Sequence, residues 1–210
     1  MLLYKVRKAS RTIVTHIQKH VSHTYHYREM IKYLNKHSKQ NLVGVEIGVL
    51  QGLNAVSIME HLSIKHLYLV DSWCIYKDLE KRSIQKIPDD ISHNKNYEVT
   101  KQRMKKHGSK VTLIRKTSEE AIKDIPNELD FVYIDANHRY DYVKKDIELY
   151  YPKLKKGGII GGHDFRADTG VAKAVLEFTE KNNLEHTGDG VDWWIVKTWE
   201  GENLLWYCTI

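Results

Sequence analysis

Four acidic residues of this sequence stand where apolar segments end. Asp71, Asp135 and Asp164 follow apolar runs, and Glu46 precedes a turn that contains two glycines. A single acid in such a place is commonly a turn former or a helix N-cap. Their repetition favours a functional site, because carboxylates that are brought together bind cations or share protons.

Asp135 and Asp164 converge at one edge of a sheet if the strands before them are neighbours, about 4.8 Å apart. The two carboxylates then repel each other unless a cation or a proton lies between them. Mg²⁺ prefers such oxygen ligands and keeps positions open for substrate hydroxyls. The pair is therefore a candidate site for a divalent cation or a shared proton.

Gly48 and Gly52, in the turn after Glu46, let the backbone approach a ligand closely. The sequence has neither the G-x-G-x-x-G pattern of a dinucleotide site nor the G-K-S/T pattern of a P-loop. The absence of the first pattern disfavours a dehydrogenase. Glu46 and Asp71 would repel a phosphate, so a ligand with hydroxyls and a positive charge suits this turn better. S-adenosylmethionine matches this description, since its ribose can bond Asp71 and its ammonium and sulfonium groups tolerate acids.

The elements that must position these residues alternate between strand-like and helix-like patterns. Short apolar, β-branched runs are found at 42–47, 67–70, 111–114, 131–134, 159–160 and 193–196. Strands that alternate with helices of about 10 to 15 residues indicate crossover connections and a mostly parallel sheet. We expect an open doubly wound α/β fold, which binds ligands at the carboxyl ends of its strands.

The charge of the chain is unevenly distributed along its 210 residues, whose formal net charge is +6. Residues 1–40 carry nine Lys and Arg against one acid, whereas residues 41–210 carry 24 basic against 26 acidic residues. We therefore divide the chain into a basic helical arm, 1–40, and a single ligand-binding domain, 41–210. We expect removal of the arm to change localisation, assembly or stability more than ligand recognition.

Ile13, Ile17 and Val21 form a narrow apolar stripe on the predicted arm. The stripe suits packing on the domain, weak contact with an anionic membrane surface or phosphate-bearing partner, or association of two copies. Three nearby histidines lack an accompanying cysteine or acid and are interpreted as exposed residues rather than a zinc site: His16, His20 and His23.

The composition indicates a soluble protein of a reducing compartment, and we expect it to be cytoplasmic. Lys5 interrupts the short apolar N-terminus, and no run approaches the roughly 18 apolar residues of a membrane span. The two cysteines, Cys74 and Cys208, do not suggest a disulfide framework.

Four segments together resemble a class I S-adenosylmethionine-dependent methyltransferase, in the branch of the macrocin and mycinamicin sugar O-methyltransferases. They are V-E-I-G-V-L-Q-G-L-N (45–54), L-V-D-S-W (69–73), Y-I-D-A-N-H-R-Y-D-Y-V-K-K-D (133–146) and L-K-K-G-G-I-I-G-G-H-D (154–164). The resemblance spans about residues 41–198. It implies a Rossmann-like methyltransferase sheet, mostly parallel with the last strand antiparallel.

The resemblance also implies a cofactor site. Glu46, Gly48 and Gly52 would line the methionine end of S-adenosylmethionine, Asp71 would hold the ribose, and Asp135 is included among the cofactor contacts. Relatives contact adenine at the position of one further residue, Ser118. Its alternative is the N-cap of the helix that begins S-E-E-A-I.

In the sugar-methylating relatives a divalent cation, usually magnesium, is held by acids at the positions of Asp135 and Asp164. His163 stands where relatives can carry a second acid. As a ligand, its imidazole would favour manganese, iron or zinc over magnesium. In the alternative, His163 does not bind the metal but contacts the residues that do. His138 matches the proposed general base. The cation would lower the pKa of an acceptor hydroxyl, and His138 would take its proton as the oxygen attacks the methyl group.

These features predict a metal-assisted O-methyltransferase that acts on a hydroxyl of a sugar, glycan or small polar natural product. The alternative is a methyltransferase-fold protein that binds RNA or a phosphorylated partner through the arm. The sequence after Asp135 has no N-P-P-Y-like motif, which argues against methylation of nucleic-acid bases. Residues 73–97 are a candidate lid, and three acids outside the motifs are interpreted as solvated loop residues: Asp168, Asp189 and Asp192.

Overall fold

The computed structural model describes residues 27–38, 40–74, 90–189 and 191–198. They form one seven-stranded sheet in the order β3-β2-β1-β4-β5-β7-β6. Strands β1 to β5 are parallel to one another, β7 runs antiparallel to β5, and β6 runs antiparallel to β7. The strands are β1 (Leu42–Ile47), β2 (Ile64–Asp71), β3 (Val111–Arg115), β4 (Leu129–Ile134), β5 (Leu154–Gly162), β6 (Thr187–Asp189) and β7 (Asp192–Val196).

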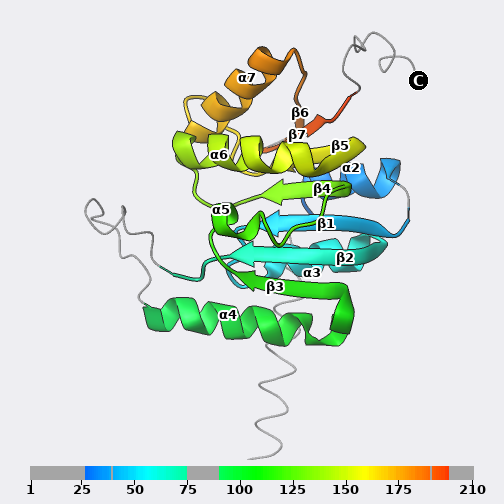
Figure 1. Cartoon of the computed structure of the whole chain (residues 1–210), viewed down its shortest axis with the longest axis vertical. Coiled ribbons are helices and arrows are strands. Elements are labelled where there is room, and N and C mark those ends of the chain that lie inside the picture. Colours follow the sequence, from blue (N-terminus) through cyan, green and yellow to red (C-terminus); the bar gives the residue numbers. More distant parts are fainter. Residues whose placement is uncertain (1–26, 39, 75–89, 190, 199–210) are drawn as a thin grey trace, which may run out of the picture.

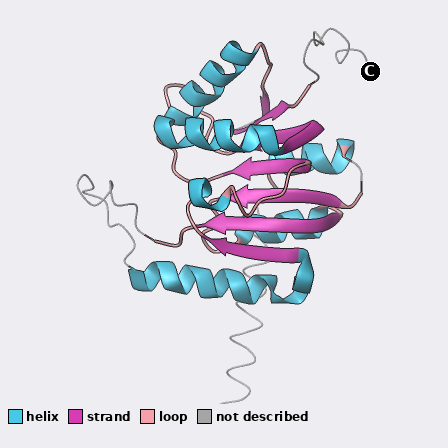
Figure 2. Ribbon diagram, viewed as in Figure 1, coloured by secondary structure: helices cyan, strands magenta, loops and turns pink. Residues whose placement is uncertain are grey.

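Helices cover both faces of the sheet (Figures 1 and 2). One face packs against α5 (Ser118–Ala121), α6 (Tyr140–Tyr150) and α7 (Gly170–Asn182). The other packs against α2 (Glu29–His37), α3 (Leu53–His61) and the end of α4 (Asp90–Met104). Two 3₁₀ turns complete the described elements, η1 (Lys105–Lys110) and η2 (Tyr151–Lys153).

The fold prediction is confirmed, and its physical basis is visible in the central strands. In β1 and β4 nearly every residue is buried, which is typical of parallel strands covered on both faces. Strand order reverses between β1 and β4, so their carboxyl ends open a crevice. The short strand β6 was not predicted.

Helix α2 lies within the segment predicted as a basic arm, but its apolar side belongs to the core. Met30, Ile31 and Leu34 are each at most 2% exposed. Burial of each such side chain stabilises the fold by about 1.5–3 kcal/mol. The predicted stripe at residues 13–21 and the three histidines beside it lie outside the described residues.

None of the helices in the described part of the chain combines the length and the apolar character that a membrane span requires.

Candidate functional site

A cavity of about 600 Å³ opens at the carboxyl ends of β1, β2 and β4, within the size range of small-molecule sites. Its position at the reversal of strand order is where doubly wound sheets bind ligands. Its lining includes Arg28, Glu46, Gly48–Gln51, Leu53, Asn54, Asp71–Cys74, His93, Asp135, Ala136 and His138.

Asp71 shapes the glycine turn after β1. One carboxylate oxygen accepts hydrogen bonds from the backbone N–H groups of Val49 and Leu50, both at 2.9 Å. The other accepts from the N–H of Trp73 at 2.7 Å. A carboxylate has about four acceptor positions, so three are used within the protein and room remains for one ligand hydroxyl.

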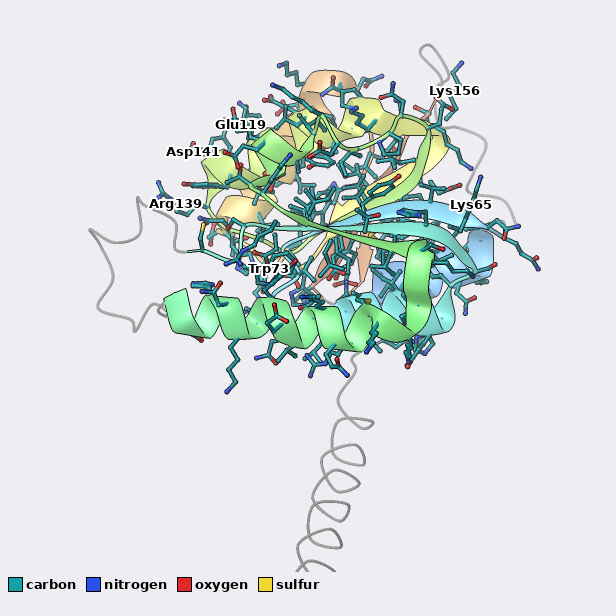
Figure 3. All side chains as sticks on the ribbon, turned by 60° about the horizontal axis from the view of Figure 1, so that its bottom comes forward. Lys65, Trp73, Glu119, Arg139, Asp141 and Lys156 are labelled. Carbon is teal, nitrogen blue, oxygen red and sulfur yellow. The ribbon has the colours of Figure 1, made fainter. Side chains whose placement is uncertain are left out.

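Helix α4 and Trp73 hold the same turn from its other side, a feature that the sequence did not reveal. The carbonyl oxygen of Leu50 accepts from Trp73 Nε1 at 2.7 Å and from Thr100 Oγ1 at 2.9 Å. Trp73 is buried and lies beside α4 in Figure 3. Its ring packs on that of Tyr97 in this helix, with the centroids 4.9 Å apart. The two aromatic residues therefore pack as structural partners, while residues 75–89 of the predicted lid lie outside the described residues.

Glu46 is a buried carboxylate whose hydrogen bonding is incomplete. Its Oε1 accepts from Asn54 Nδ2 at 3.3 Å, and its Oε2 and the amide oxygen of Asn54 have no partner within the described residues. Burial raises the pKa of Glu46 well above its usual range, and the charges of Asp135 and Asp71 add to this effect. A ligand with a positively charged N–H donor would satisfy these oxygens.

We expect Glu46→Gln to stabilise the ligand-free protein and to weaken its cofactor binding. Folding raises the pKa of Glu46, so its ionisation destabilises the folded state. This loss of stability is absent at a pH below the pKa that Glu46 has in the unfolded chain, and it grows as the pH rises above that value. Thermal melts in chelator should therefore show a higher Tm for the variant than for wild type at pH 7–8. The difference should be about 2–4 °C for each kcal/mol by which the free energy of unfolding increases. The difference should shrink as the pH approaches about 4.

The control is Glu148→Gln, which removes an exposed carboxylate from α6. It should leave both the Tm and the affinity for S-adenosylhomocysteine unchanged. A Glu46→Gln protein with a lower Tm than wild type at pH 8 would contradict a charge cost at this position.

Asp135, at the end of β4, and Asp164, just after β5, do meet, as their strands are neighbours. His138 lies between them, with Nε2 3.5 Å from Asp135 Oδ1 and 3.2 Å from Asp164 Oδ2. Ligand atoms of all three residues fall within 4.8 Å of one another, so the cluster fits a divalent cation.

The charges of this cluster are coupled. The contact with Asp135 raises the pKa of His138, burial opposes that change, and the charge of Asp164 adds to it. Burial by itself would raise the pKa of Asp164, but the neighbouring His163 and His138 imidazoles lower it overall. The two carboxylates therefore favour the protonated form of His138.

His163 lies behind Asp164 rather than in the cluster. Its Nδ1 is 3.2 Å from Asp164 Oδ2, and its Nε2 is 3.9 Å from Asp192 Oδ1. Among the described residues it is His138, not His163, that shares the cluster with Asp135 and Asp164. This geometry matches the alternative in which His163 supports a ligand without being one.

The interpretation of Asp192 as a solvated loop acid was wrong. It is the first residue of β7, 4% exposed, and accepts hydrogen bonds from the N–H of Met30 at 3.1 Å and the hydroxyl of Tyr133 at 3.3 Å. The packing of α2 against β7 covers it, and sequence patterns do not report this contact. Asp168 is exposed as expected, and the side chain of Asp189 lies outside the described part of the chain.

The structure corrects the N-cap alternative for Ser118, and the contact of Ser118 with adenine stays a prediction. The N-cap is Thr117, which forms a capping box with Glu120, so Ser118 is the first residue of α5. The Ser118 hydroxyl donates to the buried Asp146 carboxylate, and Ser118 is absent from the described lining of the cavity. Gly52, the N-cap of α3, is likewise absent from that lining.

Arg28 lines the cavity. It belongs to residues 1–40, whose removal we expected to affect ligand recognition less than localisation, assembly or stability. Its Nη2 lies 3.4 Å from Asp135 Oδ2, and its side chain is 22% exposed. The expectation about this segment therefore stays a prediction, and Arg28 is the residue at which it can be tested. The only signal in the sequence was its place directly before the apolar face of α2.

Comparison with known proteins identifies a family and agrees with the fold. The family model described as "Methyltransferase domain" matches residues 45–165, more than half of the chain. The uncharacterised protein R132 of Acanthamoeba polyphaga mimivirus is 31% identical over 146 residues, which cover 67% of this chain and 59% of that protein. The match thus spans about three fifths of the relative's length.

Three solved structures share the fold at low sequence identity. The O-methyltransferase NovP has a TM-score of 0.59 at 16% identity, with 82% of this chain and 78% of that chain covered. An O-methyltransferase from Bacillus cereus in complex with SAH has a TM-score of 0.55 at 14% identity, with 80% and 78% covered. An rRNA methylase from Streptococcus thermophilus has a TM-score of 0.56 at 13% identity, with 81% and 95% covered.

Proposed function

This chain belongs to the methyltransferase-domain family, and from that premise we propose that it transfers the methyl group of S-adenosylmethionine to a hydroxyl of a small polar acceptor such as a sugar. One observation carries the proposal. An acid-lined cavity at the ends of β1 and β2 adjoins an imidazole that stands between two carboxylates. The first suits a cationic cofactor, and the second suits removal of a proton.

The cavity supplies the groups that S-adenosylmethionine requires. The unpartnered Oε2 of Glu46 suits the methionine ammonium, and the remaining acceptor position of Asp71 suits a ribose hydroxyl. The glycine turn brings the backbone of Gly48 to the wall of the same cavity. The acids of the lining also suit the positive charge of the sulfonium.

His138 is the group that we assign to accept the hydroxyl proton. It lines the cavity and is half-exposed, so an acceptor can reach it from the cofactor side. The carboxylates that raise the pKa of His138 favour its protonated form, and the base must be neutral before it can act.

Asp135 and Asp164 are the residues that would hold a divalent cation, magnesium or manganese. When bound, the cation would polarise the acceptor hydroxyl and compensate the negative charge that holds the proton on His138. Since one nitrogen cannot bind a cation and accept a proton at once, we assign the cation to the carboxylates and the proton to His138.

Isothermal titration with S-adenosylhomocysteine tests the cofactor assignment, and a transfer screen with radiolabelled S-adenosylmethionine tests the acceptor class. The screen should include sugars, nucleotide sugars, catechols and RNA. We expect saturable binding and transfer to a hydroxyl compound. Failure of the wild-type protein to bind S-adenosylhomocysteine would end the proposal, and transfer to RNA alone would replace the acceptor class.

We expect EDTA to abolish methyl transfer and added Mg²⁺ or Mn²⁺ to restore it, because two adjacent carboxylates need a compensating charge when a neutral base works beside them. The measurement is the initial rate of transfer before and after dialysis against chelator. S-adenosylhomocysteine affinity serves as the control for loss of folding. A full rate in chelator would remove the cation from the mechanism.

A further inference from the structure

We propose that Arg28 binds the α-carboxylate at the methionine end of the cofactor, as a cofactor-binding residue contributed by the segment before α2. This inference rests on the proposed use of S-adenosylmethionine. It assigns a binding role to a residue outside the segment that the family model matches, residues 45–165.

The guanidinium of Arg28 lies in the wall of the cavity, and most of its donors meet no partner among the described residues. Its Nη2 reaches Asp135 Oδ2 at 3.4 Å, which is long for a charge-assisted hydrogen bond. A guanidinium has five N–H donors, and its other donors have no partner within the described residues. A planar anion such as a carboxylate can accept two of them at once.

The surroundings of Arg28 are complementary to a free α-amino acid group. Such a group carries an ammonium and a carboxylate on one carbon atom, so its site needs an acid and a base side by side. Glu46 offers a buried oxygen without a described partner, and Asp135 offers a second acid beside Arg28. Arg28 and Glu46 line the same cavity, so one ligand group can meet both side chains.

The charge balance of the cavity points to the same ligand group. The described lining contains three acids, Glu46, Asp71 and Asp135, and Arg28 is the permanent cation among its described residues. A cationic sulfonium and ammonium suit these acids, whereas a carboxylate would be repelled by them and attracted by the guanidinium of Arg28. Arg28 therefore favours the orientation in which the carboxylate of the methionine end faces its guanidinium.

The backbone around Arg28 is anchored, so its side chain is presented from a fixed position. Met30 and Ile31 are fully buried, and the N–H of Met30 donates to the buried Asp192 carboxylate at 3.1 Å. The carbonyl of Arg28 accepts the N–H of Lys32 at 3.0 Å and begins α2. Anchoring of this kind reduces the entropy that a ligand contact must overcome.

The test compares two ligands that differ in one group. S-adenosylhomocysteine has the carboxylate, and S-adenosyl-3-thiopropylamine lacks it but keeps the amine. Titration of Arg28→Met should show about a 10- to 100-fold loss of affinity for the first ligand, the range expected for hydrogen bonds between charged groups. Affinity for the second should change less than about threefold, and Lys36→Met, which removes an exposed charge from the same helix, should change neither.

Each other outcome overturns the inference. Equal losses for both ligands would mean that Arg28 acts only through the structure of the cavity. Unchanged S-adenosylhomocysteine affinity with a raised KM for the acceptor would mean that Arg28 binds an anionic group of the acceptor.

If Arg28→Met does not fold, Arg28→Lys and Arg28→Gln provide the same comparison. The Lys variant should retain part of the preference for the ligand with a carboxylate, and the Gln variant should retain none. Absence of binding to wild type would instead refute the proposed function.

Discussion

Replacement of His138 by asparagine should lower kcat for methyl transfer by about 10²- to 10⁴-fold, the usual contribution of a positioned general base. The imidazole is the basic group that the structure places between the carboxylates of Asp135 and Asp164, at the edge of the cavity. An amide cannot accept a proton at neutral pH, but it keeps a polar group in the same place. Affinity for S-adenosylhomocysteine should therefore stay within about threefold of wild type.

Single-turnover kinetics with saturating acceptor would measure this loss separately from product release. The matched control is His37→Asn, which changes an exposed histidine of α2. A wild-type rate in His138→Asn would disqualify the imidazole as the base. A large loss of cofactor affinity together with kcat would show that His138 contributes mainly to the shape of the site.

Gly48→Ala should destabilise the protein by about 2–5 kcal/mol and weaken S-adenosylhomocysteine binding at least tenfold. Gly48 has a φ of +86°, where an added Cβ costs about 1–2 kcal/mol. That Cβ would also come within 2.3 Å of the Asp135 carbonyl oxygen and 2.5 Å of Ala136 Cα, and such overpacking costs about 1–3 kcal/mol more. The turn after β1 and the loop after β4 would have to separate, and both line the cavity.

Urea unfolding and calorimetry of the variant would measure the two effects. Gly157→Ala separates their causes, because Gly157 has a φ of +72° but no described atom lies within 4 Å of the position that its new methyl group would take. It should cost only the backbone strain and leave binding intact. Equal effects of the two substitutions on affinity would show that the close approach of the two loops is unimportant.

The general architecture and the meeting of the two acids could be predicted from the sequence. Central parallel strands are buried on both faces, so they appear as short continuous apolar runs such as 42–47 and 131–134. Neighbouring parallel strands end at the same edge of a sheet, and this rule correctly predicts that Asp135 lies near Asp164. The glycine turn follows from the same local pattern.

The contacts between distant segments could not be predicted in this way. Asp192 is buried because α2 packs against β7, and Arg28 reaches Asp135 across 107 positions of sequence. Whether Thr117 or Ser118 caps α5 depends on which hydroxyl meets Glu120 in the folded turn. In the sequence, Asp192, Arg28 and Thr117 do not differ in type or spacing from ordinary surface residues.

The sequence by itself determined which residue types stand at the carboxyl ends of the strands, because hydrophobic periodicity and turn residues are local properties. Only the tertiary structure decided that His138 enters the acid pair while His163 stays behind it, and that a basic segment contributes Arg28 to the cavity. The physical reason is that charge and hydrogen bonding act through space. Their effect on Asp135 depends on which helices pack beside the sheet, and that packing is a property of the whole fold.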